Sequence, residues 1–182
     1  MSLVDTDWLE KNINKVKVID CSWHMPAENR NAEEEFKNEH IPNAIFFDLD
    51  KNSKNNTDLP HMLPTLDEWN KIVSNLGVSK DDQIIIYDNS NVISSCRCWY
   101  NFIYFGHNPR LVSVLNGGLK KWKKENKKIS NEIVKFSKTN YEGKELISLV
   151  KDKNKIDLNI SEKEFVVVDC LLYTSPSPRD ES

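Results

Sequence analysis

Three cysteines, Cys21, Cys96 and Cys98, are the side chains with the most reactive chemistry in the main part of the chain. Cys96 and Cys98 flank Arg97 near the expected start of a helix, where the helix N-terminus and the adjacent cation would lower a thiol pKa. We favour the alternative that both are small apolar residues packed against a sheet. Cys21 follows a predicted strand, but a phosphatase loop needs an arginine a few residues after its cysteine, and the first one here is Arg30.

The histidines suggest positioning roles rather than a metal centre. A zinc site made by Cys96, Cys98 and His107 is disfavoured because the spacing matches no closed site and no fourth ligand is evident. We therefore expect neither a metal nor a cofactor. His61 stands in a long loop, where a substrate or interdomain contact and a hydrogen bond to backbone are both open interpretations. His40 is predicted to fix the turn that follows it.

Strand and helix patterns alternate along the chain, which predicts an α/β fold with a mainly parallel central sheet flanked by helices. Strands are expected at 16–20, 44–47, 83–88 and 111–115, and helices at 32–38, 65–77, 94–105 and 119–126, after a first helix that carries Trp8, Leu9 and Ile13. Thr65 and Glu68 form a capping-box pattern. Ligands gather at the carboxyl ends of parallel strands, so the segments after Asp20, Phe47 and Asp88 are the candidate ligand edge.

Composition and charge fit an intracellular globular protein. The chain has 182 residues, 38% hydrophobic and 29% charged, with a formal net charge of −3. This balance argues against a nucleic-acid binder, and no apolar run is long enough to span a bilayer. An odd, sparse set of cysteines without a visible secretory signal predicts free thiols and a cytoplasmic location.

Several segments together resemble the rhodanese-like sulfurtransferases, and are most similar to the amino-terminal half of the two-domain 3-mercaptopyruvate/thiosulfate sulfurtransferases. The matching stretches, between about residues 5 and 125, are Asp20-Cys21-Ser22-Trp23, Glu35-Phe36, Glu39-His40-Ile41-Pro42-Asn43-Ala44-Ile45-Phe46-Phe47-Asp48-Leu49-Asp50, His61-Met62-Leu63-Pro64, Ile85-Ile86-Tyr87-Asp88, Arg97, Trp99, Phe105-Gly106-His107 and Val112-Ser113-Val114-Leu115-Asn116-Gly117-Gly118.

The resemblance implies an enzyme that moves a sulfane sulfur from 3-mercaptopyruvate or thiosulfate, through a cysteine persulfide, to cyanide or a thiol acceptor such as thioredoxin. The persulfide cysteine of the family lies in the second domain, after its central strand. Asp88 takes the matching position here, so this domain resembles the non-catalytic copy, and the resemblance assigns it no catalytic residue. A carboxylate cannot carry a persulfide.

The resemblance also places the loop 51–64 at the substrate or interdomain cleft, with Ser53 and His61 in matching positions. Lys54 stands where many relatives have an acid. It either attracts an anionic keto-acid or is solvated surface, and we favour the second. Arg97 is predicted to be the counter-charge of the loop at Asp88.

The expected organisation is a rhodanese-like domain at 1–130, a polar linker at 131–163 and the first strand of a second domain at 164–169. The strand prediction rests on a repeat, because Phe165–Asp169 follows the same pattern as Val16–Asp20. Residues 170–182 resemble a translated sequencing-library adapter and are excluded from the fold. Two alternatives stay open: a non-catalytic binding or regulatory module, and a single-domain enzyme that uses Cys96 or Cys98.

Overall fold

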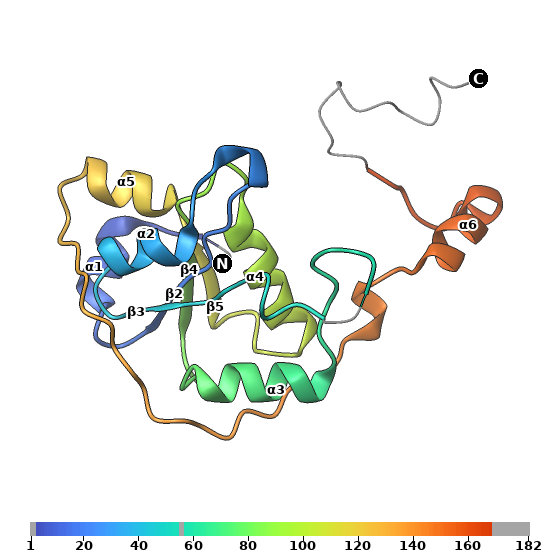
Figure 1. Ribbon diagram of the computed structural model, residues 1–182. Coiled ribbons are helices and arrows are strands. Elements are labelled where there is room, and N and C mark those ends of the chain that lie inside the picture. The colour runs from blue at the N-terminus through green and yellow to red at the C-terminus, as the bar shows by residue number, and fades with distance from the viewer. Residues whose placement is uncertain (1–2, 55–56, 169–182) are drawn as a thin grey trace. The chain divides into compact units, whose positions relative to one another are not determined.

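The computed structural model describes residues 3–54 and 57–168, which form two compact units, Met1–Ile147 and Ser148–Ser182 (Figure 1). The first unit is built on a sheet of five strands in the order β1-β5-β4-β2-β3, and every neighbouring pair is parallel. The strands are β1 Leu3–Val4, β2 Lys17–Asp20, β3 Ala44–Phe46, β4 Ile84–Tyr87 and β5 Val112–Leu115. The predicted α/β class and parallel sheet are confirmed, while the short edge strand β1 was not predicted.

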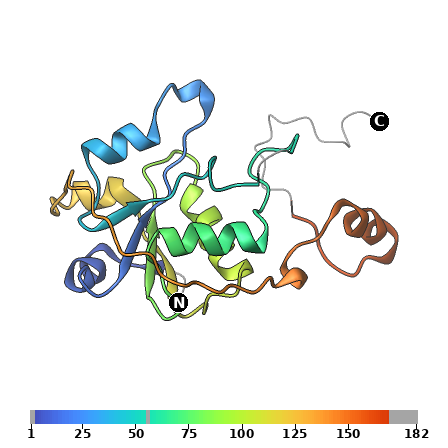
Figure 2. The same cartoon turned by 60° about the horizontal axis from the view of Figure 1, so that its bottom comes forward.

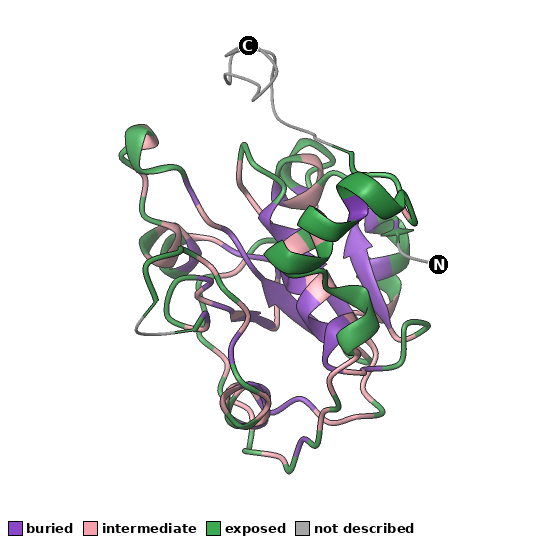
Figure 3. Cartoon of the chain, turned by 90° about the vertical axis from the view of Figure 1, so that its right-hand side faces the viewer, coloured by how far each residue is buried: buried purple, intermediate pink, exposed green. Residues whose placement is uncertain are grey.

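Helices cover both faces of this sheet (Figure 2). The helices of the first unit are α1 Thr6–Asn12, α2 Ala32–Asn38, α3 Leu66–Asn75, α4 Ser94–Tyr104 and α5 Gly118–Lys124, with a 3-10 turn η1 at Pro26–Glu28. One core cluster joins α3 and α4 to the sheet through Trp69 and Phe102, and the other joins α1, α2 and α5 to its opposite face. The strands are therefore buried between two helical layers (Figure 3).

Two local signals place these elements as the sequence predicted. Each residue of β4 is buried, as expected for a continuous apolar strand with helices on both sides. The capping box at the start of α3 is present, since the Thr65 hydroxyl accepts from the Glu68 N–H and the Glu68 carboxylate accepts from the Thr65 N–H at 2.7 Å. These contacts satisfy two N–H groups that the first turn of a helix leaves without partners.

The first unit extends to Ile147, beyond the domain boundary predicted at residue 130. Tyr141 is 2% exposed and belongs to the α3–α4 core, and its backbone N–H donates to the Ser74 hydroxyl at 2.9 Å. Gly143 and Lys144 donate to Asn70 and to the Phe105 carbonyl. The segment was predicted to be a linker because its anchoring residues follow no helical or strand period, yet it packs on the domain through single apolar side chains and backbone hydrogen bonds.

The second unit contains a helix that the sequence prediction missed, α6 Lys153–Glu162, which follows a 3-10 turn η2 at Ile147–Leu149. Asp152 caps α6 through the Lys155 N–H at 2.8 Å. Residues 165–168 are not assigned to a strand, and Val166 and Val168 are more than 80% exposed; that 164–169 is the first strand of a second domain stays a prediction. Asp169 and the adapter-like residues 170–182 lie outside the described part.

Candidate functional site

The carboxyl ends of β2, β3 and β4 meet at one edge of the sheet, where the sequence predicted a ligand site. A cleft of about 310 Å³ opens there. Its lining residues are Ser22, Trp23, His24, Arg30, Asn31, Ala32, Glu33, Phe46, Asp48, Leu49 and Asp50. These residues come from the β2–α2 connection, the start of α2, the end of β3 and the β3–α3 loop, and three of them are carboxylates, Glu33, Asp48 and Asp50.

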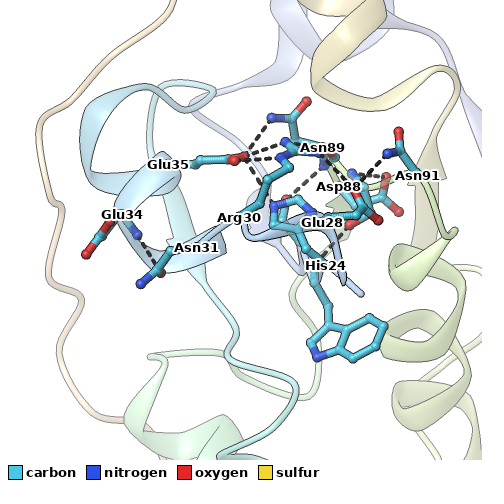
Figure 4. A network of polar contacts seen from close by, with 12 residues as sticks. His24, Glu28, Arg30, Asn31, Glu34, Glu35, Asp88, Asn89 and Asn91 are labelled. Carbon is cyan, nitrogen blue, oxygen red and sulfur yellow. Dashed lines mark hydrogen bonds and ion pairs between the residues drawn. The ribbon is translucent and has the colours of Figure 1, made fainter. Parts of the chain in front are cut away.

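Arg30 and Glu35 organise the β2–α2 side of this edge (Figure 4). The guanidinium donates to both Glu35 oxygens, from Nε at 2.7 Å and from Nη2 at 2.6 Å. Glu35 also accepts from Asn89 Nδ2 at 3.1 Å and faces His24 Nε2 at 3.2 Å. The hydrogen bonds between the two side chains lower the pKa of Glu35 and raise the pKa of Arg30. Arg30 and Glu35 therefore form a bidentate ion pair that joins the β2–α2 connection to α2.

The same network holds the loop that follows β4. Arg30 donates to the Asn89 carbonyl at 3.2 Å, and Asn91 donates to Glu28 at 2.7 Å (Figure 4). From the other side, Lys120 of α5 donates to Asn91 at 2.9 Å. The loop is thus fixed by side chains from η1, from the connection before α2 and from α5.

Asp88 stands at the end of β4 and turns its carboxylate into its own loop. One oxygen accepts from the Ser95 N–H at 2.8 Å in the first turn of α4, and the other accepts from the Ser90 N–H at 3.4 Å. The prediction that Arg97 supplies the counter-charge of this carboxylate is wrong. Backbone N–H groups at a helix N-terminus supply it instead, which is a favourable setting for a negative charge.

Asp20, at the end of β2, is 2% exposed. Its carboxylate accepts from the Ser22 N–H at 2.8 Å and from the Ser22 hydroxyl at 2.5 Å, and the same hydroxyl accepts from the Asn89 N–H at 2.8 Å. Burial raises the pKa of Asp20 to about 6 even though the hydrogen bonds of Ser22 act against that rise. Asp20 therefore links β2 to the β4–α4 loop through the Ser22 hydroxyl.

His61 and Asp50 form an acid–histidine pair on the β3–α3 loop. His61 Nε2 lies 2.6 Å from Asp50 Oδ1, and the Asp50 carboxylate also accepts from Trp23 Nε1 at 3.1 Å. The Trp23 indole meets the His61 ring edge-on, with the centroids 4.9 Å apart. Because a carboxylate only accepts, Nε2 carries the proton toward Asp50, and Nδ1 is the acceptor nitrogen of the neutral ring. We call this pair the His61–Asp50 dyad.

The other predicted site residues of this loop do not join the dyad. The Ser53 hydroxyl is buried and donates to the Leu49 carbonyl at 2.7 Å, so it closes a turn. Lys54 is exposed, and its backbone N–H donates to the Met62 carbonyl at 2.9 Å. Arg97, by contrast, reaches the dyad, because its guanidinium donates to the His61 carbonyl.

None of the described cysteines is an activated thiol. Cys21 and Cys98 are fully buried in one core cluster, and burial raises the Cys21 pKa well above its ordinary value. Cys96 is exposed, which corrects the expectation that it packs on the sheet, and its pKa is raised by burial and by the charge of Asp88. His107 is buried and bonds to Tyr141 and the Asp82 carbonyl. In the parts of the chain that the structure describes, no three acid, His or Cys side chains converge on a metal position.

Sequence reasoning missed Asp50 and Trp23 as partners of His61, although both lie in the quoted motifs. Asp50 follows a strand at the ligand edge, which is a usable signal. Its pairing with His61 depends on how the intervening loop folds back, and the contact of the Trp23 indole N–H across two loops has no sequence period.

The fold and this edge define a parallel α/β domain with a ligand-side loop after its central strand. The rhodanese-like domain family matches residues 5–125, and the chain belongs to that family. The SseA protein of Escherichia coli, a 3-mercaptopyruvate sulfotransferase with the rhodanese fold, superposes with a TM-score of 0.83 at 30% identity, over 90% of this chain and 63% of that one. The Tum1 protein of Saccharomyces cerevisiae superposes with a TM-score of 0.78 at 25% identity, over 90% of this chain and 57% of that one.

Similar sequences carry matching names. The chain is 43% identical to thiosulfate/3-mercaptopyruvate sulfurtransferase 1, mitochondrial, of Arabidopsis thaliana over 123 residues. This alignment covers 66% of this chain and 32% of that protein. It is 32% identical to the 3-mercaptopyruvate sulfurtransferase of Mus musculus, over 98% of this chain and 64% of that protein. The chain thus spans between about one third and two thirds of the length of these relatives. Within the described residues, the helices are too short or too polar to cross a membrane.

Proposed function

We propose that this chain supplies the non-catalytic rhodanese domain of a sulfurtransferase. The parent enzyme would move a sulfane sulfur from 3-mercaptopyruvate or thiosulfate, through a cysteine persulfide, to cyanide or a thiol such as thioredoxin. The observation that carries the proposal is Asp88 at the end of β4. Its carboxylate accepts the Ser95 N–H there, in the position where persulfide chemistry needs a thiolate. The cysteines that the structure describes do not replace it, because they are buried or have a raised pKa.

The chemistry sets what the missing thiolate must do. A cysteine thiolate attacks the sulfur of 3-mercaptopyruvate, the carbon–sulfur bond breaks, and its electron pair leaves on carbon as the enolate of pyruvate. The enolate takes up a proton to give pyruvate, and the cysteine keeps the transferred sulfur as a persulfide. An acceptor thiolate then attacks the outer sulfur and releases the original cysteine thiolate. The relatives are longer than this chain, and we assign the thiolate to their additional length.

The His61–Asp50 dyad would serve the proton step of this reaction. His61 is partly exposed, and its Nε2 is oriented by Asp50 at 2.6 Å. An oriented imidazole can donate a proton to a developing carbanion as a general acid, or remove a proton from an acceptor thiol as a general base. We propose that His61 Nδ1 first takes up a proton from the substrate thiol or from water, and that the resulting imidazolium passes this proton to the enolate carbon while Asp50 holds the ring through its Nε2–H.

An exposed apolar rim favours a second candidate, a binding module. Met25, Met62 and Ile93 come from three different loops at the ligand edge and are 42 to 72% exposed. Exposed apolar groups at one edge are typical of a docking surface. In the enzyme this rim would receive a second domain, whereas in a binding module it would receive a separate protein. For either function we propose a cytoplasmic location, which the free cysteines of the described residues support.

The experiment that tests the proposal is to amplify the source DNA beyond the codon for Asp169 and express both lengths. Pyruvate release from 3-mercaptopyruvate and thiocyanate release from thiosulfate and cyanide are then measured. We expect turnover by the extended protein and none by the 182-residue chain. An extension without a cysteine after its central strand, or no extension at all, would leave the binding module as the function. A His61→Ala variant of the extended protein should lose turnover, with Lys54→Ala as the matched loop control.

A further inference from the structure

His61 has a backbone conformation that needs external support. Its φ angle is +55°, in the left-handed region, which an L-residue other than glycine occupies at a cost of about 1 kcal/mol or more. The position of its ring, and so the dyad geometry, depends on keeping this conformation. Any contact that fixes the His61 peptide therefore acts on the dyad without touching the imidazole.

Arg97 makes such a contact. It projects from α4, and its Nη2 donates to the His61 carbonyl, which joins a helix on the sheet to the loop that carries the dyad. No carboxylate lies within ion-pair distance of Arg97 among the described residues, and its Nε is buried without a hydrogen-bond partner there. Burial lowers the pKa of the guanidinium. Burying a cation without a counter-ion costs stability. The hydrogen bond to the His61 carbonyl is therefore the contact that offsets part of this cost for Arg97.

Trp23 contacts both members of the dyad. Its indole Nε1 lies 3.1 Å from both oxygens of Asp50, although the Asp50 side chain is 65% exposed. The backbone N–H of Trp23 donates to the Ser90 hydroxyl at 2.9 Å, which anchors Trp23 to the β4–α4 loop. The indole also packs edge-on against the His61 ring. An exposed Asp would otherwise sample several rotamers.

We infer that Arg97 and Trp23 are positioning residues for the His61–Asp50 dyad. Arg97 holds the backbone of His61, and Trp23 holds the carboxylate and the edge of the ring. The use of the dyad in catalysis rests on the proposed function, whereas its geometry can be measured on this chain alone. Arg97 thus acts on the ring through the loop and not on the loop after Asp88, where it was expected.

The test is NMR on the 182-residue chain with ring-labelled histidine. The chain has four histidines, and His61→Gln assigns the ring signals of His61. In the wild type we expect the ring protons of His61 to be displaced by the Trp23 indole and the ring to carry its proton on Nε2. Arg97→Gln should remove most of the displacement and mix the two ring tautomers, although Arg97 does not contact the imidazole. Arg97→Lys, which keeps one donor, should retain part of the displacement.

Arg110→Gln is the matched control, because Arg110 is an exposed arginine outside the dyad, and it should leave the His61 signals unchanged. Each variant is checked for a cooperative thermal transition. A folded Arg97→Gln variant with wild-type His61 signals would overturn the inference. If Arg97→Gln does not fold, Trp23→Phe decides, since loss of the Nε2 tautomer preference supports the inference and its retention refutes it. No sulfur donor is used, so these results are independent of the turnover assay.

Discussion

Asp20 makes the stability of this domain depend on pH in a way that one substitution can isolate. The carboxyl is 2% exposed, and its pKa in the folded state is about 6, against an ordinary value of 3.8. The folded state therefore holds this proton more tightly than the unfolded state does. The stabilisation that results is complete below pH 3.8 and is lost as the pH rises through 6.

The magnitude follows from the shift of about two pKa units. The full effect is about 3 kcal/mol, and about 1.4 kcal/mol of it should be recovered between pH 7.5 and pH 5. Asp20→Asn removes the titration while its amide oxygen can still accept from Ser22. We therefore expect the wild type to gain about 1.4 kcal/mol of unfolding free energy relative to Asp20→Asn over this pH interval.

Urea unfolding followed by tryptophan fluorescence measures this difference at each pH. The result is the difference in unfolding free energy between the wild type and Asp20→Asn at each pH. The contributions of the other titrating groups are common to both proteins and cancel in this difference. Parallel pH profiles for the wild type and Asp20→Asn would show that Asp20 titrates alike in both states, and would refute the argument from burial.

Three further outcomes are expected. Arg30→Ala should cost about 1–2 kcal/mol of unfolding free energy, because it leaves the partly buried Glu35 carboxylate without its bidentate partner; urea unfolding measures it, and a loss below a few tenths would contradict the network. Gly118→Ala should cost about 1–3 kcal/mol, because the φ angle is +54° and the new Cβ would lie 2.4 Å from the Asp88 carbonyl oxygen; an unchanged thermal midpoint would contradict it. Cys96 should react with iodoacetamide more slowly than free cysteine at pH 7.5, since burial and Asp88 raise its pKa; faster alkylation would revive a single-domain enzyme.

The parts of the fold with strong local signals were predictable from the sequence. The run Ile84-Ile85-Ile86 predicted a central strand because only burial on both faces suits it, and the pair Thr65 and Glu68 marked the start of α3. The segment 131–147 was missed because Phe136 and Tyr141 contact the domain singly, without a period. The helix α6 was missed because its polar composition resembles a linker, while its Asp152 cap was a signal that could have been used.

The location of the site in the fold was predictable from the sequence, whereas most of its side-chain contacts were not. Parallel topology placed the ends of β2, β3 and β4 together, and the resemblance identified Asp88 and His61. The partner of Arg97 could not be predicted, because opposite charge favours Asp88 whereas the fold brings the His61 carbonyl within reach. The role of Asp50 likewise depends on a loop whose path has no sequence signature.

The central claim is that this domain contains no working thiolate of its own. The most direct measurement is the intact mass of the 182-residue chain after incubation with 3-mercaptopyruvate or thiosulfate, followed by cyanide. The account predicts an unchanged mass and no pyruvate or thiocyanate above the level of a Cys96→Ser variant. An added sulfur atom that cyanide removes, absent from the Cys96→Ser variant, would show that this chain carries the persulfide itself and would contradict the account.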